Sequence, residues 1–330
     1  MLAEQFVGKK PRICLTFAVR KAGPMRKIPM TSKPKSVTYN PFGYLGGMLL
    51  ASLLASSAYA LPEPGEEMLE AYRRMMCSLE DGKPTTFWWL GRAYSRVPGE
   101  KDRLLFNVEG MNIRQCKTVT DPEKGTGFKL VTKEILLYLD PKTGEVLDTW
   151  ENPWTGETVE VLHVANDPVN QPASFPVGRG GQPFALPITV VGDQWWMTSS
   201  VPLYYSNPLG GEYQDYIGGK YHATELFNFM GDIDSLESGS GDSSNYRVGW
   251  ERISDWLPWM KNGNRAGIIY FHTAGRKLES YDQMSDLMKQ QIRDNYPGYD
   301  TPPPLDDERP NETSWTFFKK KVAGNKGGGH

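Results

Sequence analysis

The sequence predicts a mainly β protein built as an antiparallel meander, and two observations lead to this fold class. First, five segments rich in β-branched and aromatic residues alternate apolar and polar side chains, the period of two that is typical of strands. They are residues 85–97, 103–119, 128–140, 144–150 and 157–164. Second, the turns between them are much shorter than the crossover of a dozen or more residues that parallel strands require. Consecutive strands are therefore expected to be antiparallel.

Strand-like segments return after a connection rich in proline and glycine at residues 167–187. They are residues 188–205, 220–230, 246–254 and 266–278. So many antiparallel strands would leave long exposed edges in an open sheet. We therefore expect the meander to close into a barrel-like (calycin-like) domain whose interior can hold one small ligand. Two packed sheets, a β-sandwich, are the alternative.

Short helices are expected on both flanks of the strands. Residues 65–76 place apolar side chains at helical spacing, and so does the segment from Leu287 to Ile292, which stops at Tyr296 before a proline. Residues 301–310 are expected to be an extended arm, and residues 321–330 a disordered tail. Residues 61–320 then form a single domain.

The first 60 residues are expected to be a signal peptide with a long basic leader. Nine basic residues and one acidic residue precede or flank an apolar run, residues 43–60, which ends in Ala-Tyr-Ala. This run is short for a membrane span, which needs about 20 residues; an uncleaved anchor is the alternative. Translation could start at Met1, Met25 or Met30. We expect a periplasmic or secreted protein.

Removing this leader leaves 28 basic and 38 acidic residues, a net charge of about −10. That charge argues against nucleic acid as a partner, and we expect no stable membrane insertion after processing.

Two cysteines remain, Cys77 and Cys116, which an oxidising compartment would allow to pair; two buried thiols are the alternative. No Cys/His zinc spacing and no dinucleotide or phosphate-binding glycine motif is present, so we predict no metal and no cofactor.

The tryptophans are candidate ligand-binding residues because several occur in pairs on expected strands. Since neighbours on a strand point to opposite faces, only one member of each adjacent pair can face the interior. Trp89, Trp195 and Trp196 are the candidates, because aromatic side chains commonly line small-molecule sites. Core filling is the alternative role.

Three histidines lie in expected strands. A metal site built from them is disfavoured because they are far apart in sequence. His163 shares a face with valines 159 and 161 and is expected to be structural. His222 is expected to be a catalytic base, with Glu225 and the ligand-binding Tyr221 in the same strand.

Residues 106–116 hold the densest mixture of polar groups within a strand-like run. Asn112 and Arg114 share a face with Gly110, whose place in mid-strand indicates a bulge or the close approach of another group. A buried Arg114 would need a carboxylate, either within the protein or on a ligand. We therefore assign Arg114 to catalysis and Asn112 to ligand binding; an Arg–Glu network that pins the strand is the alternative.

Three segments together resemble a known family. They are CSLEDGKPTTFWWLGRAYSRVPGEKDRLLFNVEGMNIRQC, WERISDWLPWMKNGNRAGIIYFHTAGRKL and RPNETSWTFFKK. The chain resembles the bacterial and fungal domain-of-unknown-function family number 1838 over about residues 70–320. This resemblance implies a single, exported domain and supplies no catalytic residues.

The function expected from the sequence is an exported protein that binds a small apolar or aromatic molecule inside a β-barrel. Cofactor-independent acid–base catalysis by His222, Arg114 and Glu225 would extend this role. Two other classes stay open: a non-catalytic carrier with the same pocket, and a structural or interaction protein with a filled core.

Overall fold

The computed structural model describes residues 61–327 except residues 179, 207–208, 210 and 238–245. The chain divides into two units, residues 1–56 and residues 57–330, and the architecture below is that of the second. The expected signal peptide lies outside the described residues.

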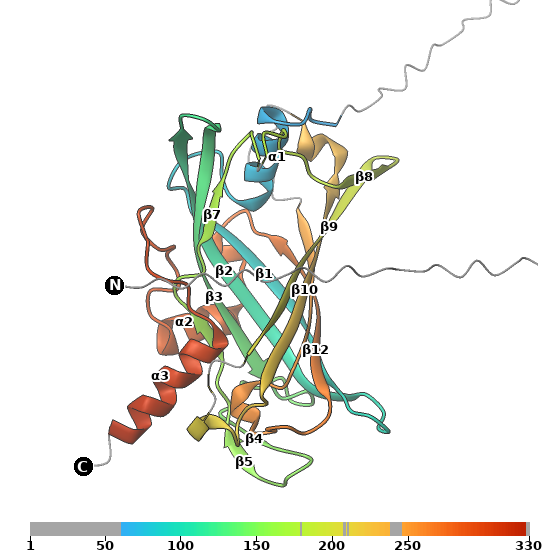
Figure 1. Ribbon diagram of the computed structural model, residues 1–330, viewed down its shortest axis with the longest axis vertical. Coiled ribbons are helices and arrows are strands. Elements are labelled where there is room, and N and C mark those ends of the chain that lie inside the picture. The colour runs from blue at the N-terminus through green and yellow to red at the C-terminus, as the bar shows by residue number, and fades with distance from the viewer. Residues whose placement is uncertain (1–60, 179, 207–208, 210, 238–245, 328–330) are drawn as a thin grey trace, which may run out of the picture. The chain divides into compact units, whose positions relative to one another are not determined.

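A ten-stranded antiparallel sheet organises this unit, which confirms the predicted meander (Figure 1). Its long strands are β1 Thr85–Arg96, β2 Arg103–Asp121, β3 Gly125–Leu139, β9 Gln194–Ser206, β10 Lys220–Asp232, β11 Arg247–Ser254 and β12 Ile268–Lys277. Short strands at its margins are β6 Val164–Asn166, β7 Gln171–Ser174 and β8 Ile188–Val191. The spatial order is β6-β3-β2-β1-β12-β11-β10-β9-β8, with β7 also on β3. Pairing of β1 with β12 joins the early strands to the late ones.

Two expected long strands are much shorter in the structure. Residues 144–150 and 157–164 contribute mainly a separate hairpin of β4 Thr149–Glu151 and β5 Thr158–Glu160, while Val146 makes a single bridge to Leu139 and Val164 begins β6. His163 therefore lies between β5 and β6 rather than in a strand. Asp148, a turn-forming residue, interrupts the first run, so the second run has only the three residues of β4 to pair with.

The helices lie around the sheet. They are α1 Glu66–Met76, α2 Asp286–Asn295 and α3 Ser314–Gly327, with short 3₁₀ turns η1 Gly211–Tyr213, η2 Ile233–Leu236, η3 Pro258–Met260 and η4 Tyr281–Gln283. The last helix takes in residues 321–327, which were expected to belong to a tail. No helix within the described ranges is long and apolar enough to cross a membrane.

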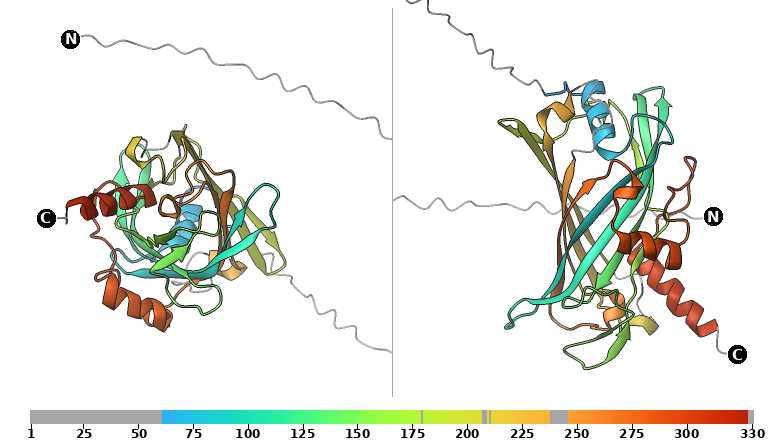
Figure 2. Two further views of the ribbon diagram at one scale, coloured as in Figure 1. Left: turned by 90° about the horizontal axis from the view of Figure 1, so that it is seen from below. Right: turned by 180° about the vertical axis from the view of Figure 1, so that it is seen from behind.

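Backbone pairing does not close the described sheet into a barrel, because the strand path ends at β8 on one side and β6 on the other. The sheet is nevertheless strongly curved (Figure 2), and side chains from its two halves meet over the concave face. A sandwich of two large sheets is not what the described residues form.

Two apolar clusters fill the concave side. One contains Phe106 and Tyr138 from early strands together with Trp259 and Phe271 from late ones. The other lies toward α1 and contains Phe87, Trp195 and Phe229 with the apolar face of that helix. On the convex side, α2 covers β2 and β3, where Met288 and Ile292 pack on a third cluster.

A disulfide between Cys77 and Cys116 ties the end of α1 to β2, with Cα atoms 6.1 Å apart, which confirms the predicted pairing. Next to it, Lys277 Nζ donates to the carbonyl oxygens of Arg74 (2.7 Å) and Cys77 (2.8 Å). Carbonyl oxygens at the end of a helix favour a cation, so α1 is held by charge as well as by a covalent bond.

Candidate functional site

Four charged side chains lie on the concave face between the two apolar clusters. They are Arg114 of β2, Glu134 of β3, Glu225 of β10 and Arg252 of β11. Strand alternation dictates this placement: Glu134 shares its face with the core residue Tyr138. We call these four side chains and the polar groups bonded to them the interior layer.

Arg252 is the cation of the interior layer that has a carboxylate partner. Its Nη1 lies 2.6 Å from Glu225 Oε1, and its Nη2 donates to the Tyr221 hydroxyl. Burial acts to lower the pKa of Arg252, but Tyr221 and Glu225 outweigh it and raise that pKa. Glu225 is thereby committed to a structural ion pair.

Glu134 is the carboxyl group with the least support. Its Oε1 accepts one hydrogen bond, from Asn166 Nδ2 at 2.9 Å. Burial raises the pKa of Glu134; the Asn166 bond opposes that rise, Glu225 adds to it, and Arg252 and Arg114 oppose it. A carboxyl group with a raised pKa can donate or accept a proton nearer to neutral pH.

Arg114 is a buried cation with neutral partners. Its Nε (2.9 Å) and Nη2 (2.6 Å) donate to Asn112 Oδ1, and its Nη1 donates to Met76 O at 3.3 Å. The guanidinium carbon lies 4.5 Å from the centre of the Phe87 ring. Burial lowers the pKa of Arg114 to about 10, so it stays charged at neutral pH. Among the described residues, no carboxylate lies within ion-pair distance of it.

Trp89 borders the interior layer, and its position explains why residue 110 is a glycine. A Cβ atom added at Gly110 would lie 2.3 Å from the Trp89 indole, so the close approach that the sequence predicted is confirmed. The Trp89 ring centre is 6.4 Å from that of Trp250. Two buried donors here have no hydrogen-bond partner, Trp89 Nε1 and Arg252 Nε.

Solvent-accessible surface persists at this level of the concave face. Along β10, Ala223 and Phe229 are buried, whereas Glu225 and Phe227 between them are half-buried. On β11 the side chains of Arg252 and Trp250 are also half-buried. The exposed fraction of the Arg252 side chain is 18%. The interior layer is thus more accessible to solvent along β10 and β11 than the clusters on either side of it.

Five of the predicted site residues lie together here: Arg114, Asn112, Glu225, Tyr221 and Trp89.

His222 does not join them, because it points to the convex face. Its side chain is 50% exposed, its Nδ1 lies 2.8 Å from Asp255 Oδ2, and its ring centre is 4.6 Å from that of Tyr204. Residues of opposite parity on one strand cannot converge, so His222 is not a base for the interior layer.

Trp195 and Trp196 also lie elsewhere. Trp195 is fully buried, and its Nε1 donates to Asp232 O (3.1 Å) and Ser235 Oγ (3.0 Å), so it belongs to the core. Trp196 points outward and is 39% exposed.

His163 occupies a structural position, as predicted. Its Nδ1 accepts a hydrogen bond from the Tyr138 backbone N–H at 3.0 Å, and burial lowers its pKa to about 4. It is therefore neutral at neutral pH. In the part of the chain that the structure describes, no three His, Cys, Asp or Glu side chains are grouped to hold a metal ion.

Comparison with known proteins gives a family. The family described as Protein of unknown function (DUF1838) matches residues 82–322. The chain belongs to this family. No curated protein matches the chain. The matched region begins after α1 and Cys77 and contains all four charged residues of the interior layer.

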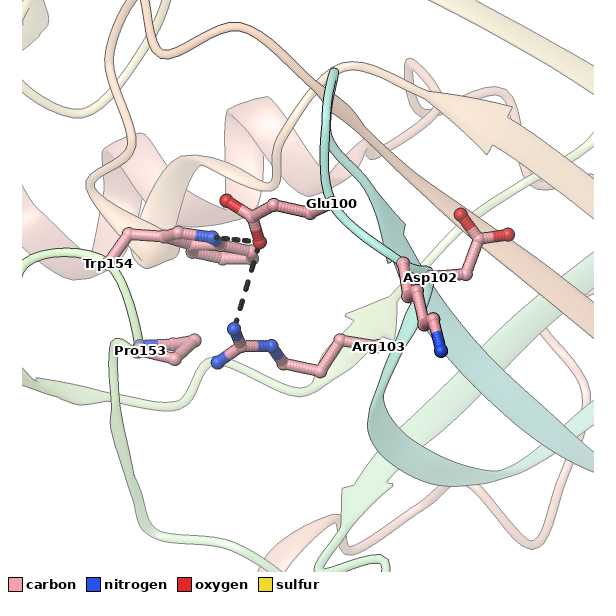
Figure 3. Close-up of a pocket in the computed structure, with 6 residues that line it drawn as sticks. Glu100, Asp102, Arg103, Pro153 and Trp154 are labelled. Carbon is pink, nitrogen blue, oxygen red and sulfur yellow. Dashed lines mark hydrogen bonds and ion pairs between the residues drawn. The ribbon is translucent and has the colours of Figure 1, made fainter.

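A surface hollow of this family member lies between the β1–β2 turn and the β4–β5 hairpin (Figure 3). Glu100 Oε2 accepts a hydrogen bond from Trp154 Nε1 at 3.2 Å and lies 3.7 Å from Arg103 Nη2. These groups satisfy one another at an exposed surface. None of the predicted site residues lines the hollow, so the interior layer is the stronger candidate.

Sequence reasoning missed Glu134, Arg252, Trp250 and Asn166. A signal was available for the first two: each is a charged residue at the parity of core side chains within a long strand. Asn166 had no such signal, because it lies in the three-residue strand β6.

Proposed function

We propose that this chain is an exported protein that holds a small, partly aromatic molecule in the interior layer, inside a sheet that encloses its ligand as a barrel would. The basic leader and apolar run of the first 60 residues support export. The curvature of the sheet supports enclosure, because concave-face residues of early and late strands share the same apolar clusters.

One observation carries the proposal: two buried N–H groups without partners, Trp89 Nε1 and Arg252 Nε, border the same half-buried region. Leaving a buried donor unpaired costs about 1–3 kcal/mol. Such groups call for an explanation in a folded protein. A ligand with a hydrogen-bond acceptor would satisfy them, while Trp250 and Phe227 supply the apolar walls that small-molecule sites usually have.

Access to the interior layer is proposed along β9. This strand pairs with β8 only over residues 194–197, so its remaining edge has no strand partner among the described residues. Pro202 brings no N–H group to that edge, which disfavours pairing with another strand. Val201 faces inward opposite Glu225, yet it is 42% exposed. An inward-facing side chain that meets solvent is what an opening requires.

Acid–base catalysis is the second function that a specific observation favours. Burial raises the pKa of Glu134 despite the opposing influence of Arg252 and Arg114, and a carboxyl group with a raised pKa can exchange protons with a substrate nearer to neutral pH. Glu134 takes the place proposed from sequence for His222, and Arg114 and Arg252 would stabilise negative charge. Glu225 would fix Arg252. This chemistry needs no organic cofactor.

Native mass spectrometry of protein purified from its host tests the proposal. We expect wild-type protein to carry a bound small molecule. Trp250→Leu, which removes an apolar wall, should lose it, and the matched control Trp196→Leu on the convex face should retain it. Wild-type protein without any bound mass, and without binding to a panel of aromatic compounds, would contradict the proposal. A bound molecule that Trp250→Leu retains would place the site elsewhere.

A further inference from the structure

We infer that the molecule held in the interior layer is an aromatic carboxylate whose carboxylate group pairs with Arg114. This inference rests on the proposed function and adds the chemical class of the ligand.

The distribution of charge in the interior layer favours an anionic ligand group. Arg252 has Glu225 at 2.6 Å, whereas Arg114 has only the neutral oxygens of Asn112 and Met76. The remaining carboxyl group of the layer, Glu134, is hydrogen-bonded to Asn166 instead. Glu134 acts to raise the pKa of Arg114 electrostatically but makes no ion pair with it. A buried cation without a paired counter-charge is costly, and a bound anion would remove that cost.

The unused hydrogen-bond donors of Arg114 favour a carboxylate as that group. Its guanidinium group has five N–H donors, and three of them are used by Asn112 Oδ1 and Met76 O. Its guanidinium carbon lies over the Phe87 ring, and this contact together with the three hydrogen bonds holds the group in place. Two donors remain for a ligand. A carboxylate is the group that matches a planar guanidinium fork best.

The spacing between Gly110 and Arg114 on β2 favours a ligand that carries both an aromatic ring and a carboxylate. Gly110, on which the Trp89 indole rests, precedes Arg114 by four residues on the same face. Four residues of strand span about 13 Å. The Arg114 side chain bends back along this distance to Asn112 Oδ1, and Asn112 is only two residues, about 7 Å of strand, from Gly110. An aromatic ring beside Trp89 and a carboxylate at Arg114 are therefore within reach of one molecule about the size of a fused bicyclic acid. Asn112 is half-buried between these two positions, and its Oδ1 accepts hydrogen bonds from Arg114.

Calorimetric titration with 2-naphthoate and its neutral analogue 2-naphthamide tests the inference. For wild-type protein we expect 2-naphthoate to bind at least tenfold more tightly than 2-naphthamide. In Arg114→Gln this ratio should fall to about one, and in Arg114→Lys it should fall less, because the charge remains and the fork is lost. Arg96→Gln is the control, since it removes one exposed cation that pairs with Asp102 outside the layer.

The outcomes separate the two proposals. If 2-naphthamide binds wild-type protein as tightly as 2-naphthoate, the carboxylate inference is wrong while the aromatic ligand of the proposed function stands. If neither compound binds, the carboxylate inference is contradicted, and the proposed function is decided separately by the mass that native mass spectrometry finds on the purified protein. The wild-type comparison needs no variant, so a failure of Arg114→Gln to fold leaves the test intact. An equal loss of preference in Arg96→Gln would assign the effect to net charge and overturn the role of Arg114.

Discussion

Replacing His163 with phenylalanine should change the dependence of stability on pH, and the structure gives the size of the change. His163 accepts a hydrogen bond from the Tyr138 N–H, and its ring lies 5.9 Å from the Tyr138 ring. Phenylalanine keeps the ring contact but leaves this N–H unpaired. At pH 7 we expect a loss of about 1–3 kcal/mol in the free energy of unfolding.

The pH dependence follows from the lowered pKa of His163. Burial lowers this pKa to about 4 in the folded protein, against about 6.5 in the unfolded chain. The unfolded state therefore binds the proton more readily, so the neutral imidazole's contribution is complete above pH 6.5 and is lost as the pH falls toward 4. The difference of about 2.5 pH units corresponds to about 3 kcal/mol, with a slope near 1.4 kcal/mol per pH unit around pH 5.

Urea unfolding at pH 7, 6, 5 and 4 measures this effect. The stability of wild-type protein should fall by about 3 kcal/mol more than that of His163→Phe over this range, so that the two curves converge. His272→Phe is the matched control, because the His272 side chain is 73% exposed; its curve should run parallel to wild type. Parallel curves for wild type and His163→Phe would refute the assignment of His163 as a buried neutral histidine.

Three further predictions follow from local contacts. Gly110→Ala should lower the melting temperature markedly, since its methyl group would lie 2.3 Å from the Trp89 indole; an unchanged melting temperature would contradict this packing. Thiol counting under denaturing, non-reducing conditions should find Cys77 and Cys116 oxidised, and reducing their disulfide should cost about 4 kcal/mol for a sequence separation of 39 residues. His222→Phe should change stability by less than about 0.5 kcal/mol and leave ligand binding intact, because the side chain is 50% exposed on the convex face; a loss of binding would place the site outside.

The long strands could be predicted because each sustains alternation over many residues. β2 and β3 run for 19 and 15 residues and are joined by a short turn, so both their direction and their neighbours follow from local sequence. Closure could not be predicted in the same way. It depends on whether two edges far apart in the sequence meet, and at β9 the edge carries Pro202 and only four residues paired with β8.

Strand parity predicted on which face several of the candidate site residues lie. Parity placed Arg114 and Asn112 on one face, and it placed Tyr221 and Glu225 on the face opposite His222. His222 was chosen for its chemistry against that parity, and the structure puts it outside.

Glu134 and Arg252 were within reach of the same rule, because each shares the parity of core residues in its strand. What the sequence could not supply is the approach of β3 to β10 and β11 across the concave face, through which Glu134 comes under the influence of Glu225 and Arg252. That approach comes from curvature of the whole sheet.

A crystal structure of the protein purified with its retained small molecule tests the central claim most directly. We predict electron density for the ligand within the interior layer, with an acceptor atom within hydrogen-bond distance of Trp89 Nε1 or Arg252 Nε and an anionic group at Arg114. Density confined to the surface hollow at Trp154, with the interior layer filled only by protein side chains, would contradict the account.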